Sequence, residues 1–201
     1  MTEPGMRAVE NRIFGQLPQL EGQRVLLREM VPADAPALGA LASDDQIYRL
    51  EPTFLYERKH ADPAEVIARM RAECLDTGES LLWAVCLRSR PDELVGIGEA
   101  YGLEPQKPKM SIGYRLRRPW WGQGIATEVA GLLRDYLRDE CGMRTITAHV
   151  LPDNLGSARV LEKNGFRRLF SNIPEDWGWD ELVPVDKWVY KRRWDEGFPE
   201  D

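Results

Sequence analysis

The stretch from Ser111 to Phe166 constrains the fold of this chain more than any other part of the sequence. Its centre is Trp-Gly-Gln-Gly-Ile-Ala-Thr at residues 121–127, which places a pair of glycines at the expected start of a helix. A helix start presents unpaired backbone N–H groups and a partial positive charge, and glycines lack the Cβ atoms that would hold a phosphate away from the backbone. The segment is therefore expected to bind a diphosphate.

Two common phosphate-binding motifs fit this segment poorly. The dinucleotide fingerprint requires a third glycine three positions after Gly124, where this chain has Thr127. The P-loop requires a Lys-Ser or Lys-Thr pair after the glycines, and none follows here. Neither of these two motifs therefore accounts for the glycine turn.

A second motif lies downstream, at residues 154–166, with the sequence Asn-Leu-Gly-Ser-Ala-Arg-Val-Leu-Glu-Lys-Asn-Gly-Phe. Together with the glycine turn, it resembles the GCN5-related N-acetyltransferase (GNAT) family, in particular its ribosomal-protein-acetylating, RimJ/RimL-like branch. A glycine pair at a helix start is common by itself, but both motifs at the family's spacing make the resemblance specific. It extends from Gln23 to Trp194.

Composition agrees with one globular domain. The chain has 201 residues, of which 43% are hydrophobic, enough for a substantial core. We expect an acyltransferase domain at residues 23–194, a loose segment at 1–22 and an acidic tail at 195–201. No apolar run approaches the roughly 20 residues that span a bilayer, and no leader pattern is visible, so we expect a cytoplasmic protein without membrane contact.

Charge and cysteine usage narrow the class of partner. The net charge of −6 and the pI near 5.2 argue against nucleic-acid binding and favour an amine or cationic partner. The three cysteines (Cys74, Cys86 and Cys141) and two histidines show no metal-ligand spacing, so we expect reduced thiols and no metal.

Periodicity predicts an α/β (α+β) domain with about seven strands and four helices. The predicted strands lie at residues 24–30, 81–87, 93–101, 110–116, 145–150, 166–170 and 187–193. The predicted helices lie at 32–41, 63–76, 125–141 and 155–164. Segments 43–61 and 171–186 show neither period and are predicted to be irregular.

The family resemblance implies how these elements bind acetyl-CoA. It implies a mixed, mostly antiparallel sheet that splays apart between its fourth and fifth strands, with the pantetheine arm of the co-substrate in the gap. The arm would pair with the backbone of Tyr114, Arg115 and Leu116. The diphosphate would lie on the amides of Gly122, Gln123, Gly124, Ile125, Ala126 and Thr127. Asn154 would bond the arm, cap the following helix, or do both.

The chemistry requires a neutral amine and a stabilised leaving thiolate. Ser157 lies one turn after Asn154 and is the candidate on the leaving side. On the attacking side the branch often has a glutamate where this chain has Ser111. Glu99 is the substitute, because strand alternation would place it beside Val95 and Ile97, where burial would raise its pKa.

The opposite face of the predicted strand 93–101 is expected to pack against a helix. It carries Gly96, Gly98 and Ala100, whose small side chains permit close approach.

Acceptor recognition is expected in the two segments that the cofactor motifs do not explain, 48–60 and 171–186. The second contains Trp177 and Trp179 among acidic residues, a composition suited to an amine-bearing ligand. Packing of these tryptophans against the core, or in a homodimer contact, remains an alternative.

The resemblance thus implies an N-acetyltransferase that moves an acetyl group directly from acetyl-CoA to a primary amine. A peptide or protein N-terminal α-amine is favoured, because about a tenth of such groups are neutral at pH 7, against less than about 0.1% for lysine. A small-molecule amine would satisfy the same argument. A non-catalytic acyl-CoA sensor is the alternative from another class, because Ser111 stands at the expected acidic position.

Overall fold

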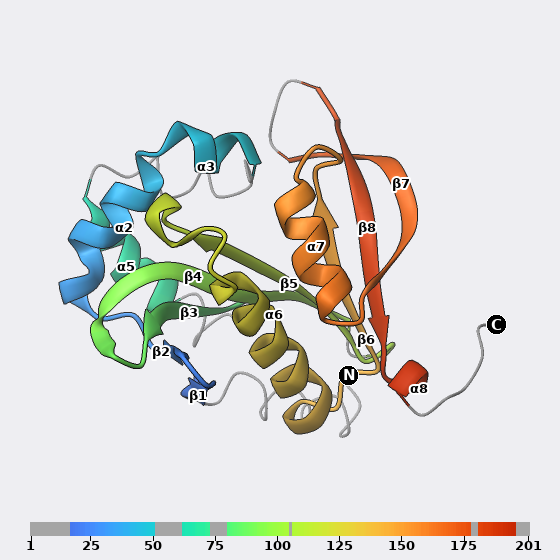
Figure 1. Ribbon diagram of the computed structural model, residues 1–201, viewed down its shortest axis with the longest axis horizontal. Helices are drawn as coiled ribbons and strands as arrows, with labels where there is room; N and C mark the ends of the chain where they lie inside the picture. The colour runs from blue at the N-terminus through green and yellow to red at the C-terminus, as the bar shows by residue number, and fades with distance from the viewer. Residues whose placement is uncertain (1–16, 51–61, 73–79, 105, 178–180, 196–201) are drawn as a thin grey trace, which may run out of the picture.

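One eight-stranded sheet organises the chain (Figure 1). The structure, a computed structural model, describes residues 17–50, 62–72, 80–104, 106–177 and 181–195. The strand order is β1-β2-β3-β4-β5-β6-β8-β7, and every neighbouring pair is antiparallel except β5 and β6. The strands are β1 (Leu20–Glu21), β2 (Val25–Arg28), β3 (Ser80–Leu87), β4 (Arg90–Glu104), β5 (Lys109–Leu116), β6 (Thr145–Val150), β7 (Arg167–Glu175) and β8 (Val183–Lys191).

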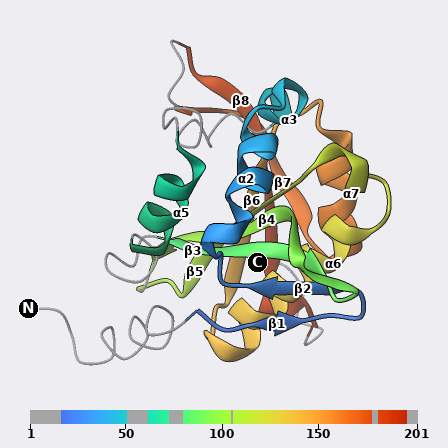
Figure 2. The ribbon, with the colours of Figure 1, turned by 90° about the vertical axis from the view of Figure 1, so that its left-hand side faces the viewer.

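Helices cover both faces of the sheet. They are the 3-10 turns η1 (Pro32–Asp34) and η4 (Arg118–Trp120), the α-helices α2 (Ala35–Ala42), α3 (Asp45–Leu50), α5 (Pro63–Ala72), α6 (Ile125–Asp135), α7 (Leu155–Lys163) and α8 (Arg192–Asp195), and the π-helical turn η5 (Tyr136–Glu140), which continues α6. Figure 2 shows α2 and α5 on one side of β2, β3 and β4, with α6 on the other. The fold class is the one predicted, and the four predicted helices are all present.

The splay that the family resemblance implied is present between β5 and β6. The two strands pair only from Lys109 opposite Thr145 to Ser111 opposite Thr147. At that last pair the two hydroxyl groups share a buried hydrogen bond of 2.7 Å. Beyond it the strands diverge, and the two halves of the sheet separate toward α3 and α7 (Figure 1).

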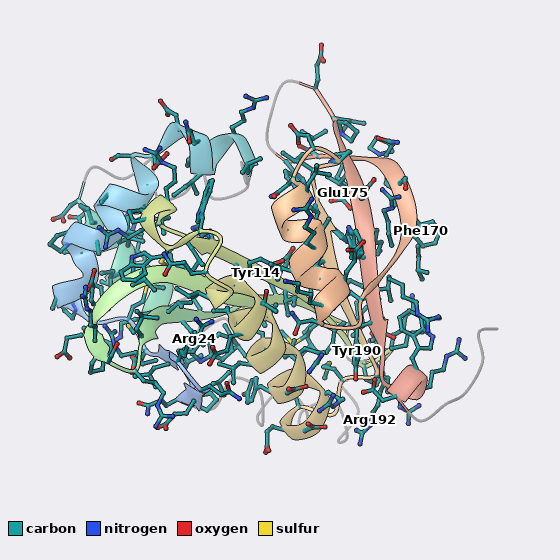
Figure 3. The ribbon with its side chains drawn as sticks, in the orientation of Figure 1. Arg24, Tyr114, Phe170, Glu175, Tyr190 and Arg192 are labelled. Atoms are coloured by element: carbon teal, nitrogen blue, oxygen red, sulfur yellow. The ribbon has the colours of Figure 1, made fainter. Side chains whose placement is uncertain are left out.

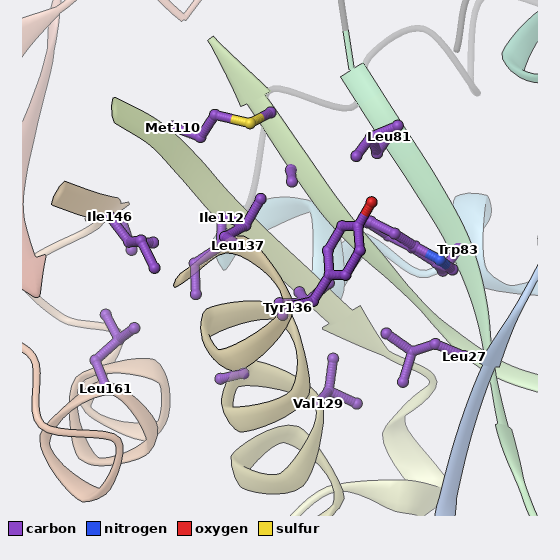
Figure 4. Close-up of a cluster of buried hydrophobic side chains, with 14 of the residues drawn as sticks. Leu27, Leu81, Trp83, Met110, Ile112, Val129, Tyr136, Leu137, Ile146 and Leu161 are labelled. Atoms are coloured by element: carbon purple, nitrogen blue, oxygen red, sulfur yellow. The ribbon is translucent and has the colours of Figure 1, made fainter. Parts of the chain in front are cut away.

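The core has two parts, one on each face. The larger lies between the sheet and helices α6 and α7 (Figure 4). There Trp83 is fully buried, stacks edge-on against Tyr136 at 5.7 Å and donates its indole N–H to Pro18 O. As predicted, this face of β4 packs against a helix, since the position of a Cβ on Gly98 would lie 3.4 Å from Val129 of α6. The smaller part lies under α2 and α5.

Strand β4 departs from simple alternation, which corrects the predicted surroundings of Glu99. Leu94 and Ile97 both pack on the α2–α5 side, whereas Val95 packs on the α6 side. The register with β3 shifts at this point, so Val95 is the extra residue of a β-bulge. Glu99 therefore shares a face with Ile97 and with its partner Leu82, but not with Val95.

The two segments predicted to be irregular contain regular structure. Residues 45–50 form α3, which was too short for its period to be recognised. Residues 167–175 and 183–191 form β7 and β8, where two register shifts and the positive φ of Asn172 (54°) interrupt the alternation that predicts a strand. Strand β1 lies within the segment expected to be loose. Residues 51–61, 178–180 and 196–201 lie outside the described residues.

Two cysteines are buried. Cys86 and Cys141 are both free thiols, and burial raises the pKa of each to about 11. Cys74 lies outside the described residues. Within the described ranges, no helix is long and apolar enough to cross a membrane, and no group of three or more metal-ligating side chains gathers.

Candidate active site

Two adjoining cavities lie where the sheet splays. One, of about 640 Å³, extends from the start of α6 to α7, and we call it the glycine-turn cavity. The other, of about 440 Å³, is lined by residues of β4, β5, β6 and β7, and we call it the acidic cavity because Glu99, Glu175 and Asp176 line it. Both are lined by Leu50, Tyr114, Asn154 and Ser157.

The glycine turn has a backbone conformation that suits an anion site. Gly122 and Gly124 have φ of 72° and 78°, a region that side chains with a Cβ rarely adopt. Gly124 is the N-cap of α6 and has no side chain to bond the first-turn amides, and the residues of that turn line the cavity. Trp121 donates its indole N–H to Leu116 O at 2.7 Å and joins the turn to β5.

Most of the predicted cofactor residues line this cavity. They are Tyr114, Arg115, Leu116, Gly122, Gly124, Ile125, Ala126, Thr127 and Asn154. Gln123 is the exception: it does not line the cavity, and its side-chain amide donates to Pro119 O at 2.7 Å. The carbonyl of Gln123 accepts a hydrogen bond from Arg24, which fixes the turn against the start of β2.

Positive charge in the glycine-turn cavity comes from β5 and α7. Arg115 lines it from β5, whereas Arg118 pairs with Asp44 and Arg117 donates to Leu94 O. Arg159 and Lys163 of α7 supply the other cationic groups. They are four residues apart on one helix face, a spacing that could have identified them in the sequence.

Tyr114, Asn154 and Ser157 form the junction between the cavities. Ser157 Oγ lies 2.9 Å from the hydroxyl of Tyr114, and this contact joins β5 to α7 across the splay. Figure 3 shows Tyr114 between the two halves of the sheet. Asn154 Oδ1 accepts from the backbone N–H of Ser157 at 3.1 Å and caps α7. Asn154 and Ser157 therefore lie together at the start of α7. Tyr114, which was expected to contribute only its backbone, also contributes its hydroxyl.

The acidic cavity brings together residues from distant parts of the chain. Glu99 lines it from β4, and Glu175 and Trp177 line it from β7 and the residues that follow. The indole N–H of Trp177 donates to Glu175 Oε2 at 3.0 Å. Trp179 lies outside the described residues. Leu50 also lines the cavity, so the described parts of both predicted acceptor segments border one space.

His149 is the functional candidate that the sequence interpretation missed. It lines the acidic cavity from β6, and its Nδ1 lies 2.9 Å from Glu175 Oε2. Burial lowers the pKa of His149, and the neighbouring Glu175 carboxylate partly offsets that effect. Alternation along residues 145–150 was the available signal, because Ile146, Ala148 and Val150 face the α6–α7 core and leave His149 on the other face.

Comparison with known proteins identifies the fold. The acetyltransferase (GNAT) domain family matches residues 24–167. The uncharacterized N-acetyltransferase YoaA of Bacillus subtilis is 27% identical over 173 residues, which cover 86% of this chain and 95% of the relative.

Two solved structures show the same architecture. RimJ of Mycobacterium smegmatis, in complex with CoA-disulfide, has a TM-score of 0.76 at 23% identity and covers 93% of this chain and 92% of its own. Spermidine N-acetyltransferase from Vibrio cholerae, in complex with CoA and spermine, has a TM-score of 0.69 at 14% identity and covers 86% of this chain and 98% of its own. With its glycine turn, splayed strands and family match, the chain belongs to the GNAT family and is an acetyl-CoA-dependent N-acetyltransferase.

Proposed function

We propose that this enzyme acetylates a primary amine by direct attack within a ternary complex, with a peptide or protein N-terminal α-amine as the favoured acceptor. The observation that carries the proposal is the pair of adjoining cavities of opposite charge. Arg115, Arg159 and Lys163 line one, Glu99, Glu175 and Asp176 line the other, and both share Tyr114, Asn154 and Ser157. An anionic co-substrate and a cationic acceptor would therefore meet at the junction.

The glycine-turn cavity fits the diphosphate of the co-substrate. The first-turn amides of α6 and the positive φ at Gly122 and Gly124 suit a bound anion, and the cationic side chains balance its charge. We propose that Tyr114, Arg115 and Leu116 contact the pantetheine arm along β5. When bound, acetyl-CoA supplies an activated thioester carbonyl.

The junction suits the leaving side of the reaction. We assign Ser157 to proton donation toward the departing sulfur, with the Tyr114 hydroxyl, 2.9 Å away, able to replenish that proton. Asn154 orients the first turn of α7 through its bond to the N–H of Ser157 and lines both cavities, so one side chain serves the cap and the site.

The acidic cavity suits the acceptor. Carboxylates attract an ammonium group, and the rings of Trp177 and Tyr101, which line the same space, offer faces for cationic or apolar parts of a ligand. We assign Trp177 and Trp179 to acceptor binding, and Glu99 to the attacking side, where its carboxylate attracts the ammonium group. A terminal α-amine is favoured because its pKa leaves more of it neutral than a lysine side chain.

A small-molecule amine is the second candidate acceptor. The specific observation in its favour is that the acidic cavity, at about 440 Å³, lies within the range of small-ligand sites and carries more than one carboxylate. A second cationic group on a small acceptor would find a partner there.

An acceptor screen tests the proposal. Release of free thiol from acetyl-CoA would be followed with N-terminal peptides, the same peptides blocked at the α-amine, aminoglycosides, polyamines and amino acids. We expect release with unblocked peptides and none with the blocked series. Turnover confined to small amines would select the second candidate, and acetyl-CoA binding without thiol release would indicate a sensor instead.

Two further expectations belong to this proposal. A cytoplasmic location would keep Cys86 and Cys141 reduced, in agreement with their free state. Homodimerisation is a separate hypothesis, and sedimentation of the sample used for the screen would test it.

A further inference from the structure

We infer that His149, held by Glu175, removes the proton from the incoming ammonium group, in the place that the sequence suggested for Glu99. This assignment deepens the proposed function and rests on it. His149 lies on the strand that diverges from β5 at the splay, and it lines the acidic cavity together with Glu99, Tyr114 and Ser157. The candidate base and the candidate acid therefore border the same space.

The hydrogen bonds of the imidazole assign its tautomer. Nδ1 lies 2.9 Å from Glu175 Oε2, and a carboxylate only accepts, so Nδ1 carries the proton. The lone pair of the neutral ring is then on Nε2. That atom is buried, and no residue in the described ranges hydrogen-bonds it. A buried acceptor with an unused lone pair calls for a partner, which an amine N–H, or a water between the two, would provide.

Glu175 is itself fixed, which makes it a suitable positioning residue. The same Oε2 atom that faces Nδ1 also accepts the indole N–H of Trp177 at 3.0 Å. The carboxylate thus has one oxygen shared between ring and indole, and it would stabilise the imidazolium that forms when Nε2 takes a proton. This gives Trp177 a second task beyond contact with the acceptor.

The charges around the ring favour a neutral base. Burial is the largest influence and lowers the pKa of His149; Lys187, its register partner on β8, and Lys109 on β5 lower it further. Glu175 raises it. The balance keeps the imidazole neutral at physiological pH and able to accept a proton. An imidazole is also a stronger base than a carboxylate of ordinary pKa, near 4, and a better match to an ammonium group.

The proton steps balance over one turnover. One N–H bond of the ammonium breaks and its proton moves to Nε2, directly or through one water. The freed nitrogen lone pair forms the C–N bond as the C–S bond breaks. The sulfur takes a proton from the Ser157–Tyr114 hydroxyl pair, which recovers one from the acetylated nitrogen. The imidazolium then releases its proton to solvent, so each turnover yields amide, thiol and one proton.

The small number of histidines allows a direct test. The chain has only His60 and His149, so His60→Gln leaves one imidazole, whose pKa is measured by NMR titration. In the same background, kcat/KM against pH should show an acidic limb at that pKa. Glu175→Gln should move both values to lower pH, and Lys187→Met should move both to higher pH, because the two groups act on the ring with opposite sign. A merely structural role predicts no such paired movement.

The outcomes separate this assignment from the proposed function. His149→Gln should lower kcat/KM by about 10²- to 10⁴-fold and remove the acidic limb, with acetyl-CoA affinity retained. Two results would overturn the assignment and leave the proposed function intact. One is amine-dependent turnover whose acidic limb persists in His149→Gln. The other is an acidic limb that does not move in Glu175→Gln and Lys187→Met. Failure of every amine to release thiol, while His149 titrates as expected, would instead reject the proposed function and the assignment with it.

Discussion

The two cavities of this enzyme are built in different ways. The glycine-turn cavity is formed largely by neighbours in sequence, since residues 120–127 and 153–163 supply most of its lining. The acidic cavity is assembled from β4, β6 and β7, whose contributing residues Glu99, His149 and Glu175 are far apart in the chain. A contiguous motif can be recognised as a unit before the fold is known, whereas the grouping of single residues from separate strands cannot.

The largest expected effect concerns the junction, which belongs to both cavities. Ser157→Ala should lower turnover by about 10²- to 10⁴-fold, because a general acid is lost, while affinity for acetyl-CoA is retained. The rate would be measured as thiol released over time with the identified acceptor, and the affinity for acetyl-CoA would be measured by calorimetry. Ser43→Ala is the matched control, since its hydroxyl bonds Gly39 O at the end of α2, away from both cavities. Full turnover in Ser157→Ala would reduce this serine to a helix residue.

Replacing Gly124 should affect only the glycine-turn cavity. A residue with a Cβ held at positive φ costs about 1–3 kcal/mol, so Gly124→Val would either strain the turn or misalign its amides. We expect acetyl-CoA to bind about tenfold more weakly or worse by calorimetry. Gly142→Val imposes the same strain at a φ of 72°, outside both cavities, and should leave affinity unchanged. Equal affinity in the two folded variants would place the diphosphate elsewhere.

Replacing the two tryptophans should affect only the acidic cavity. Replacing Trp177 and Trp179 together by Ala should raise KM for the acceptor roughly 2- to 30-fold, the value of about 0.5–2 kcal/mol of cation–π contact, and leave acetyl-CoA affinity as it was. Trp194→Ala serves as the control, because Trp194 stacks under Arg167 and lines neither cavity. Unchanged acceptor kinetics in the double variant would favour a packing or dimer role.

The smallest effect is on stability as a function of pH. Because the folded-state pKa of His149 is depressed, the folded protein binds fewer protons than the unfolded chain near the ordinary histidine pKa of about 6.5. Stability should therefore be full above that pH and decline as pH falls through the folded pKa. Denaturant unfolding between pH 5 and 7 would measure the slope, which His149→Gln should flatten. An identical slope in that variant would contradict the depressed pKa.

The fold was largely predictable because its long elements have clear periods. Helix α6 and strand β6 lie where their patterns placed them. Strands β7 and β8 were only partly recognised, since register shifts and the turn of the backbone at Asn172 break alternation where no residue type marks it. Likewise, the bulge at Val95 depends on pairing with β3, which is not a local property of the sequence.

The candidate site, like the fold, was predictable only in part. The amides of the glycine turn follow from backbone conformation, which glycine itself signals. The bond from Tyr114 to Ser157 and the contact between His149 and Glu175 each join elements that meet only after the sheet has formed. Side-chain partners across a splay depend on how far the strands separate, and no spacing in the sequence records that distance.

The buried thiols have a practical consequence for an enzyme whose product is itself a thiol. Oxidised coenzyme A exchanges with protein cysteines only through an accessible thiolate, and neither Cys86 nor Cys141 provides one at neutral pH, since burial raises the pKa of both to about 11. These positions should resist mixed-disulfide formation as product accumulates. They should also remain unreactive toward thiol-reactive dyes, so that neither contributes colour to a thiol-release assay.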